Sequence, residues 1–366
     1  MERMVTSTMT WYLEKNNISI EEQAGFRRGS MAKSSSALKN SVVVNSLLKS
    51  WNATNLRYEE SPHPTVLLRI PGLTHESFDR NWNPKATSLM QTSATARAYV
   101  FHTALPATTA GAKEGHETEE KYFLDWLRLT EEFLVFVSSS ELVISRALYE
   151  NNVQKWPLDM RFVLGNVGNR TITSTNEFYT CDGDCNKLLW TNTTQFVAVD
   201  KTTRKAAKLP DWYLSKYKGK GYMDKGLIVK PFSRPDVTYV HPHVVQWKDT
   251  DNYKHTNWTS YVRWATDALH AALLLQSPSL PSHYSPYTTT GDSVTSTAKA
   301  ALHGITEDII ARGLQKMHIV YLRECLQGES VEIHVWQNSR EEKELVYFSV
   351  VKDGEDVCQI KFWFFT

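Results

Sequence analysis

Two stretches of this chain follow the same order of secondary structure, and this repeat constrains the fold more than any other feature. The first stretch predicts a short apolar strand (65–70), a helix (84–102) and then alternating, β-branched strands between residues 131 and 200. The second predicts a strand (237–247), a helix (257–276) and four strands up to the end of the chain. The two stretches share this plan but little residue identity.

Both predicted helices have sequence features that support them. Pro84 follows Asn83, which predicts Asn83 as the cap of the first helix. The second helix has an apolar stripe at helical spacing, formed by Tyr261, Trp264, Ala265, Ala268, Leu269 and Ala272. A long helix wrapped by a curved antiparallel sheet is the hotdog plan, so we expect an α+β protein with tandem hotdog domains.

The repeat also predicts the domain boundaries. Residues 51–200 form the expected N-terminal hotdog, and residues 236–366 form the expected C-terminal hotdog. Between them, the basic segment 201–235 is interrupted by Pro210 and several glycines, which is typical of a linker. We expect residues 1–50 to be a poorly ordered leader.

The leader has a feature that the rest of the chain does not share. The stretch ISIEEQAGFRRG (18–29) resembles a short piece of the reverse transcriptases of non-LTR retrotransposons, which suggests a transposon-derived origin for the leader. Nothing later in the chain resembles that family's paired catalytic aspartates. The resemblance therefore does not imply a polymerase.

Composition excludes several classes of protein. The formal net charge is +1, from 41 basic and 40 acidic residues, so we expect no nucleic-acid partner. The most apolar run, Phe133–Val137, is far shorter than the roughly 20 residues that span a bilayer. The first residues show no signal-peptide core, so the protein is expected to be intracellular, cytoplasmic or mitochondrial, and not secreted.

The four cysteines do not form a recognisable site. They are too few for a disulfide framework and include no CxxC pair, so we expect a reducing compartment, no metal and no cofactor. They are Cys181, Cys185, Cys325 and Cys358.

Three motifs occur in an order that resembles a known family. They are VAVDKTTRKAAKLPDW (197–212), WKDTDNYKHTNWTSYVRW (247–264) and VYLREC (320–325). The second resembles the signature W-S-D-x-D-x-N-x-H-x-N-N-x-x-Y-x-x-W of the double-hotdog acyl-acyl-carrier-protein thioesterases of plants and bacteria. The third is similar to that family's E-Y-R-R-E-C strand. The resemblance runs from about residue 65 to the end of the chain.

The resemblance implies a candidate active site. Asp251 and His255 fall on active-site positions of the family, and Glu324 and Cys325 fall on the acidic residue and cysteine of its strand motif. The departures from the signature lie in the same stretch. Tyr253 stands where the family has Asn, and so does Trp258, which follows the retained Asn257; Tyr253 and Asn257 are our candidate substrate-binding residues.

These residue types suit hydrolysis of a thioester. Glu324 or Asp251 can activate water as a general base, and His255 can donate or relay the proton. Cys325 is an alternative nucleophile in a Cys–His arrangement. Asn257 begins the predicted helix, whose N-terminus offers N–H groups to the developing oxyanion.

We therefore predict an acyl thioesterase that acts on a fatty acyl thioester of CoA or acyl-carrier protein, with the acyl pocket in the N-terminal hotdog. A non-catalytic acyl-thioester-binding protein and a 3-hydroxyacyl dehydratase-like enzyme are the alternatives. The basic run at Lys201, Arg204, Lys205 and Lys208 could contact an acidic carrier or belong to a solvated linker. Monomer and homodimer are both compatible with a double hotdog.

Overall fold

The structure is a computed structural model. The leader 1–50, with its reverse-transcriptase-like stretch, lies outside the residues that the structure describes, and so does Tyr253. The described residues are 51–106, 120–181, 186–251, 255–276, 291–339 and 341–366. Within them, no helix is long and apolar enough to cross a membrane.

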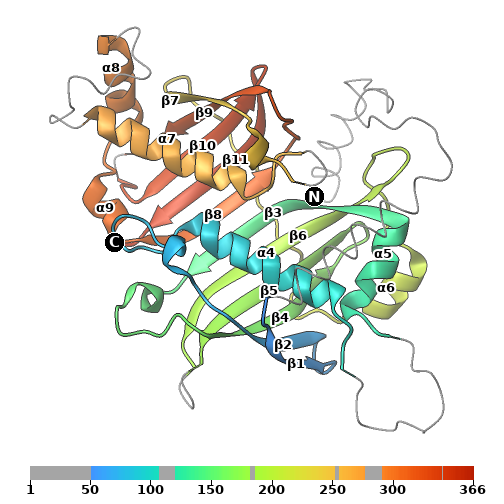
Figure 1. Cartoon of the computed structure of the whole chain (residues 1–366). Coiled ribbons are helices and arrows are strands. Elements are labelled where there is room, and N and C mark those ends of the chain that lie inside the picture. The colour runs from blue at the N-terminus through green and yellow to red at the C-terminus, as the bar shows by residue number, and fades with distance from the viewer. Residues whose placement is uncertain (1–50, 107–119, 182–185, 252–254, 277–290, 340) are drawn as a thin grey trace, which may run out of the picture.

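A single antiparallel sheet of eleven strands runs through both halves, as Figure 1 shows. Its strand order is β1-β2-β4-β5-β6-β3-β8-β11-β10-β9-β7. The strands are β1 (Thr54–Glu59), β2 (Thr65–Ile70), β3 (Phe133–Ile144), β4 (Leu158–Val167), β5 (Thr171–Thr180), β6 (Leu188–Asp200), β7 (Tyr239–Val244), β8 (Leu314–Tyr321), β9 (Ser330–Trp336), β10 (Leu345–Lys352) and β11 (Glu355–Phe364).

Two long helices, α4 (Ala86–His102) and α7 (Ser260–Gln276), each lie across one half of the sheet (Figure 1). Each half thus has a strand, a long helix and further antiparallel strands, as the sequence predicted. The whole apolar stripe predicted on α7 is buried. The shorter elements are η1 (His75–Ser77), η2 (Phe123–Asp125), α5 (Trp126–Glu132), η3 (Arg146–Tyr149), α6 (Asp211–Tyr217), η4 (Trp247–Asp249), α8 (Gly291–Ala301) and α9 (Glu307–Ala311).

The predicted cap of the first helix is wrong. The cap position is Lys85, which makes no side-chain capping bond. Asp79 accounts for the difference, because its carboxylate accepts a hydrogen bond from the backbone N–H of Asn83 at 2.9 Å and holds that residue in a turn. The Asn83 side chain donates instead to the carbonyl of Ala311, at 3.0 Å.

The two halves join where β3 pairs with β8. Their register runs from Ser139 opposite Val320 to Val143 opposite Lys316. At the centre, the Glu141 carboxylate lies 2.5 Å from His318 Nε2 and 2.7 Å from Lys316 Nζ. Hydrogen bonding to His318 first, and then to Lys316, lowers the pKa of Glu141 to about 2.

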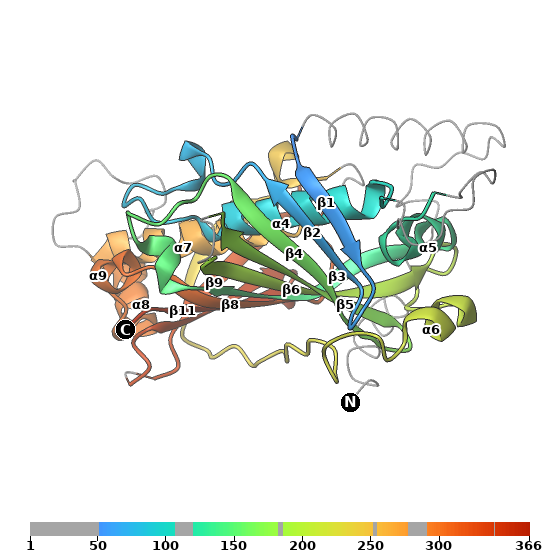
Figure 2. The same cartoon turned by 90° about the horizontal axis from the view of Figure 1, so that it is seen from below.

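The segment 201–235 passes across the side of the sheet opposite α4 (Figure 2). Backbone N–H of Met223 donates to the Gly165 carbonyl on β4 at 2.8 Å. The Phe232 backbone exchanges two hydrogen bonds with the Gln359 side chain on β11, at 2.8 and 2.7 Å. This segment is therefore hydrogen-bonded to both halves.

Candidate active site

The loop before α7 is built around a buried carboxylate. Asp249 is fully buried, and it accepts hydrogen bonds from the Arg263 side chain and from the backbone N–H of Gln246, the latter at 2.8 Å. His243 Nε2 lies 3.2 Å from Asp249 Oδ2, the same oxygen that accepts from Gln246. These donors hold the loop in place. If one of them moved away, the buried carboxylate would lose a partner that water cannot replace, which is energetically unfavourable.

Asp251 and His255 lie at the two ends of the next turn. The backbone N–H of Asp251 donates to the His255 carbonyl at 2.9 Å. In return, the His255 N–H donates to Asp251 Oδ1 at 3.4 Å. Asp251 therefore contacts the backbone of His255 and helps to position its imidazole ring.

The next residues attach this turn to the segment that follows β8. Both the backbone N–H and the hydroxyl of Thr256 donate to the Cys325 carbonyl, each at 2.9 Å. This places His255 Nδ1 3.4 Å from Glu324 Oε1, with the two side chains 23% and 36% exposed. Two of the four predicted catalytic side chains thus meet, and both remain open to solvent.

Arg204, from the segment between the halves, joins His255 and Glu324 to form a cluster of three charged or titratable side chains. Arg204 Nη2 lies 3.8 Å from the same Glu324 oxygen, and its guanidinium sits 5.4 Å from the centre of the Phe136 ring. Sequence reasoning treated Arg204 only as a member of a basic run. The signal that could have found it is its place in the first of the three family-like motifs.

Lys201, another member of the basic run, lies elsewhere: its ammonium group donates to the carbonyls of Thr130 and Glu131.

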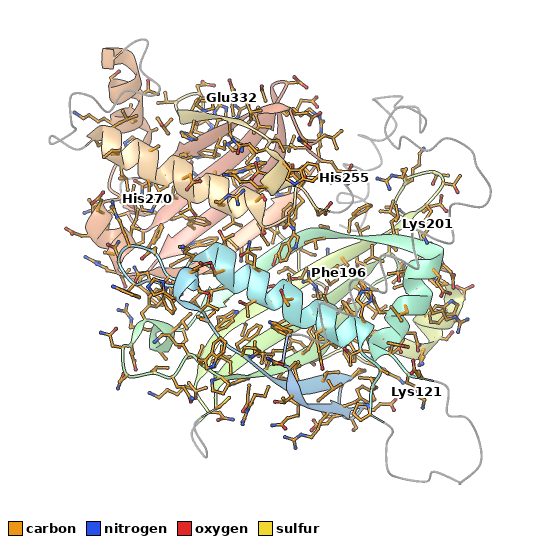
Figure 3. All side chains as sticks on the ribbon, viewed as in Figure 1. Lys121, Phe196, Lys201, His255, His270 and Glu332 are labelled. Atoms are coloured by element: carbon orange, nitrogen blue, oxygen red, sulfur yellow. The ribbon has the colours of Figure 1, made fainter. Side chains whose placement is uncertain are left out.

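Figure 3 places His255 near the N-terminal end of α7, at the boundary between the two halves. The helix begins at Ser260, three residues later than the sequence predicted, and Asn257 forms a turn before it: its Oδ1 accepts hydrogen bonds from the backbone N–H and hydroxyl of Thr259, at 2.9 and 2.8 Å. Asn257 and Trp258 also line a pocket of about 230 Å³ that lies between this helix end and α4. Glu324 and His255 are not among the lining residues, so the pocket borders the cluster without enclosing it.

Cys325 does not face this cluster as a nucleophile would. It is fully buried, and burial raises the pKa of its thiol to about 11, although a hydrogen bond from Tyr261 opposes that shift. Reactive cysteines have a lowered pKa and some exposure. The burial argues against the catalytic role predicted for Cys325.

Three solved structures share this fold over nearly their whole length. A protein provisionally assigned as an oleoyl thioesterase from Lactobacillus plantarum superposes with a TM-score of 0.55 and 16% identity, over 84% of this chain and 98% of that one. The 12:0-acyl-carrier-protein thioesterase from Umbellularia californica gives 0.53 and 14%, over 82% and 97%. An acyl-acyl-carrier-protein thioesterase from Bacteroides thetaiotaomicron gives 0.51 and 13%, over 82% and 98%.

These likenesses confirm the predicted fold. The chain is a double hotdog, of the kind that the acyl-acyl-carrier-protein thioesterases adopt. No protein-family model and no curated protein sequence matches it. The comparisons give no support to the reverse-transcriptase resemblance of the leader.

Proposed function

We propose that this protein is a thioester hydrolase that releases a fatty acid from an acyl thioester of CoA or acyl-carrier protein. The observation that carries the proposal is the contact between His255 and Glu324 beside the N-terminal end of α7. An imidazole paired with a carboxylate at a helix N-terminus combines a proton acceptor with a stabiliser of negative charge.

In the proposed reaction, Glu324 holds the Nδ1–H of His255 and so leaves Nε2 as the proton acceptor. His255 Nε2 takes a proton from water as the water oxygen attacks the thioester carbonyl carbon. When the tetrahedral intermediate collapses, the C–S bond breaks and the imidazolium returns the proton to sulfur. The products are the free acid and the thiol, and no oxidant or reductant is needed.

The neighbouring residues have supporting roles in this proposal. Asp251 is a positioning residue, because its carboxylate contacts the backbone N–H of His255. Asn257 binds substrate at the pocket edge through its amide nitrogen, since its oxygen already accepts hydrogen bonds from Thr259. Arg204 contacts the Glu324 carboxylate and ties the segment between the halves to the site. Tyr253, a predicted substrate-binding residue, lies outside the described residues.

The domain assignment follows from the same arrangement. We place catalysis in the C-terminal hotdog (236–366), which contributes His255 and Glu324, and the acyl pocket in the N-terminal hotdog (51–200). Residues 201–235 connect the two. The protein acts inside the cell, where acyl thioesters of CoA and acyl-carrier protein are found, as a monomer or a homodimer.

Thiol release from a panel of acyl-CoAs and acyl-carrier proteins of increasing chain length tests this function. We expect turnover with at least one member and a loss of about 100-fold or more in Glu324→Gln. Glu332→Gln, at an exposed glutamate on β9, is the matched control. Binding of the same thioesters with no thiol release would instead identify a binding protein. Loss of water from a 3-hydroxyacyl thioester would identify a dehydratase.

A further inference from the structure

A buried arginine lies under the long helix of the N-terminal half. Arg97 on α4 is only 7% exposed, and its Nη1 donates to Thr194 Oγ1 at 3.2 Å. Within the described residues, no carboxylate forms an ion pair with it. Its guanidinium lies over two rings instead, 4.9 Å from the centre of Phe196 and 5.2 Å from that of Trp258. Burial lowers its pKa only to about 10, so the charge persists at neutral pH.

The sheet beneath Arg97 presents neutral polar groups that bond to one another. Asn192 Nδ2 donates to Ser140 Oγ at 2.8 Å, and Thr194 Oγ1 donates to Asn192 Oδ1 at 3.2 Å. These side chains are buried. They satisfy each other's hydrogen bonds and supply no negative charge to Arg97.

The same polar layer contains unsatisfied atoms. Ser174 stands directly opposite Thr194 in the β5–β6 pairing, and Asn176 stands opposite Asn192. Ser174 Oγ and Asn176 Oδ1 are buried and have no hydrogen-bond partner among the described residues. Asn176 Nδ2 donates to the carbonyl of Ser93 on α4, so this face of the sheet is turned toward the helix. A buried polar atom without a partner is costly, and buried layers normally satisfy nearly all of theirs.

The layer adjoins the candidate active site through Trp258. This residue lines the pocket next to Asn257 and also stacks against Arg97. Its backbone carbonyl accepts a hydrogen bond from Tyr321 at 2.9 Å. Phe196 lies on β6, and its ring contacts the Arg97 guanidinium from the side of the sheet. In Figure 3 it lies behind α4. An acyl group that enters past Trp258 would therefore meet the charge of Arg97.

We propose that this polar layer binds a carboxylate carried by the acyl group, so that the preferred substrates are mono-thioesters of dicarboxylic acids. The inference rests on the proposed thioesterase function. A guanidinium matches a carboxylate in charge and in its paired donor geometry. A plain alkyl chain in the same place would leave the buried charge uncompensated, which is unfavourable in a low dielectric.

Matched substrates test this proposal. Octanoyl-CoA is compared with its ω-carboxylated counterpart, suberyl-CoA, as substrate for the full chain. We expect a higher kcat/KM for suberyl-CoA, and a fall of about tenfold or more in the suberyl-to-octanoyl ratio for Arg97→Met. Arg97→Lys should restore part of the ratio, and Arg128→Met, at an exposed arginine on α5, should leave it unchanged. A preference for octanoyl-CoA, or an unaltered ratio in Arg97→Met, would overturn the proposal.

A second readout does not depend on hydrolysis, so it separates failure of this inference from failure of the proposed function. Free suberate should raise the Tm of the wild-type protein more than octanoate does, and Arg97→Met should lose that difference. Without ligand, Arg97→Met should be at least as stable as wild type, because an uncompensated buried charge has been removed. A lower Tm of the unliganded variant, with equal effects of both acids on wild type, would show that Arg97 is a structural residue and refute the proposal.

Discussion

His255 Nδ1 lies 3.4 Å from Glu324 Oε1, and the residue that follows each of them takes part in hydrogen bonds that join the two segments. Thr256 donates twice to the Cys325 carbonyl, so the loop before α7 and the segment after β8 are joined in fixed register. A side-chain pair positioned by adjacent backbone contacts is pre-organised, which is what proton transfer in a catalytic site requires.

Asp251→Asn should reduce kcat by about tenfold, less than the loss in Glu324→Gln. Asparagine keeps an oxygen that can accept the His255 N–H, so the turn persists while the local charge is lost. Steady-state kcat and KM for both variants provide the comparison. A loss in Asp251→Asn that equals or exceeds the loss in Glu324→Gln would assign Asp251 a direct role on the substrate.

Cys325→Ala should retain hydrolysis within about threefold of wild type, because the thiol is fully buried and its pKa is raised. The native protein should likewise resist inactivation by iodoacetamide. Activity after treatment, and alkylation at this position read by mass spectrometry, are the two measurements. Inactivation that tracks alkylation of Cys325 would restore it as a nucleophile.

Asp249→Asn should lower the free energy of unfolding by about 1.5–3 kcal/mol, because it removes the charge from a buried hydrogen-bonded contact with Arg263, whose side chain keeps partial access to solvent. Urea unfolding measures this loss. Asp211→Asn is the control, since that side chain is 87% exposed and pairs with Lys208 only at the surface. Equal midpoints for the two variants would mean that the Asp249 network does not hold the loop.

Glu141→Gln should weaken the junction between β3 and β8 in a pH-dependent manner. Because the pKa of Glu141 is lowered from 4.5 to about 2 in the folded protein, its stabilisation is present above pH 4.5 and is lost as the pH falls toward 2. After allowance for solvent screening, we expect a loss of about 1 kcal/mol at pH 7.

Urea unfolding of wild type and Glu141→Gln, followed from pH 7 to pH 2.5, measures this effect. The difference between the two proteins should shrink steadily below pH 4.5. A difference that stays constant over the whole range would show that the contacts of Glu141 with His318 and Lys316 do not depend on its charge.

The sequence was sufficient for the elements that have a strong apolar period. The α7 stripe and β2 were predictable because one face of each is buried. Apolar residues therefore recur at the spacing that places them on that face. The edge strand β1 was missed because four of its six residues are exposed, and only Leu56 and Tyr58 alternate with them as half-buried apolar residues. The short helix α6 was missed inside a segment that Pro210 and glycines made resemble a linker.

Contacts between segments that are distant in the sequence were harder to predict. The pairing of β3 with β8 joins two complete halves, and nothing in either strand identifies the other as its partner. His255 and Glu324 were predicted together because they lie in motifs that resemble a known family. The approach of Arg204 to Glu324 depends on how the segment between the halves crosses the sheet, which local sequence does not determine. The same holds for Arg97: its position on a helix does not reveal that no carboxylate among the described residues forms an ion pair with it.

A double-mutant cycle on His255 and Glu324 tests the central claim most directly. His255→Gln, Glu324→Gln and the combined variant are compared with wild type by kcat/KM for a thioester that the wild-type protein hydrolyses. If the two side chains act as one unit, the combined variant should lose about as much activity as either single variant. Losses that multiply, or a single variant that retains full activity, would contradict a catalytic His255–Glu324 pair.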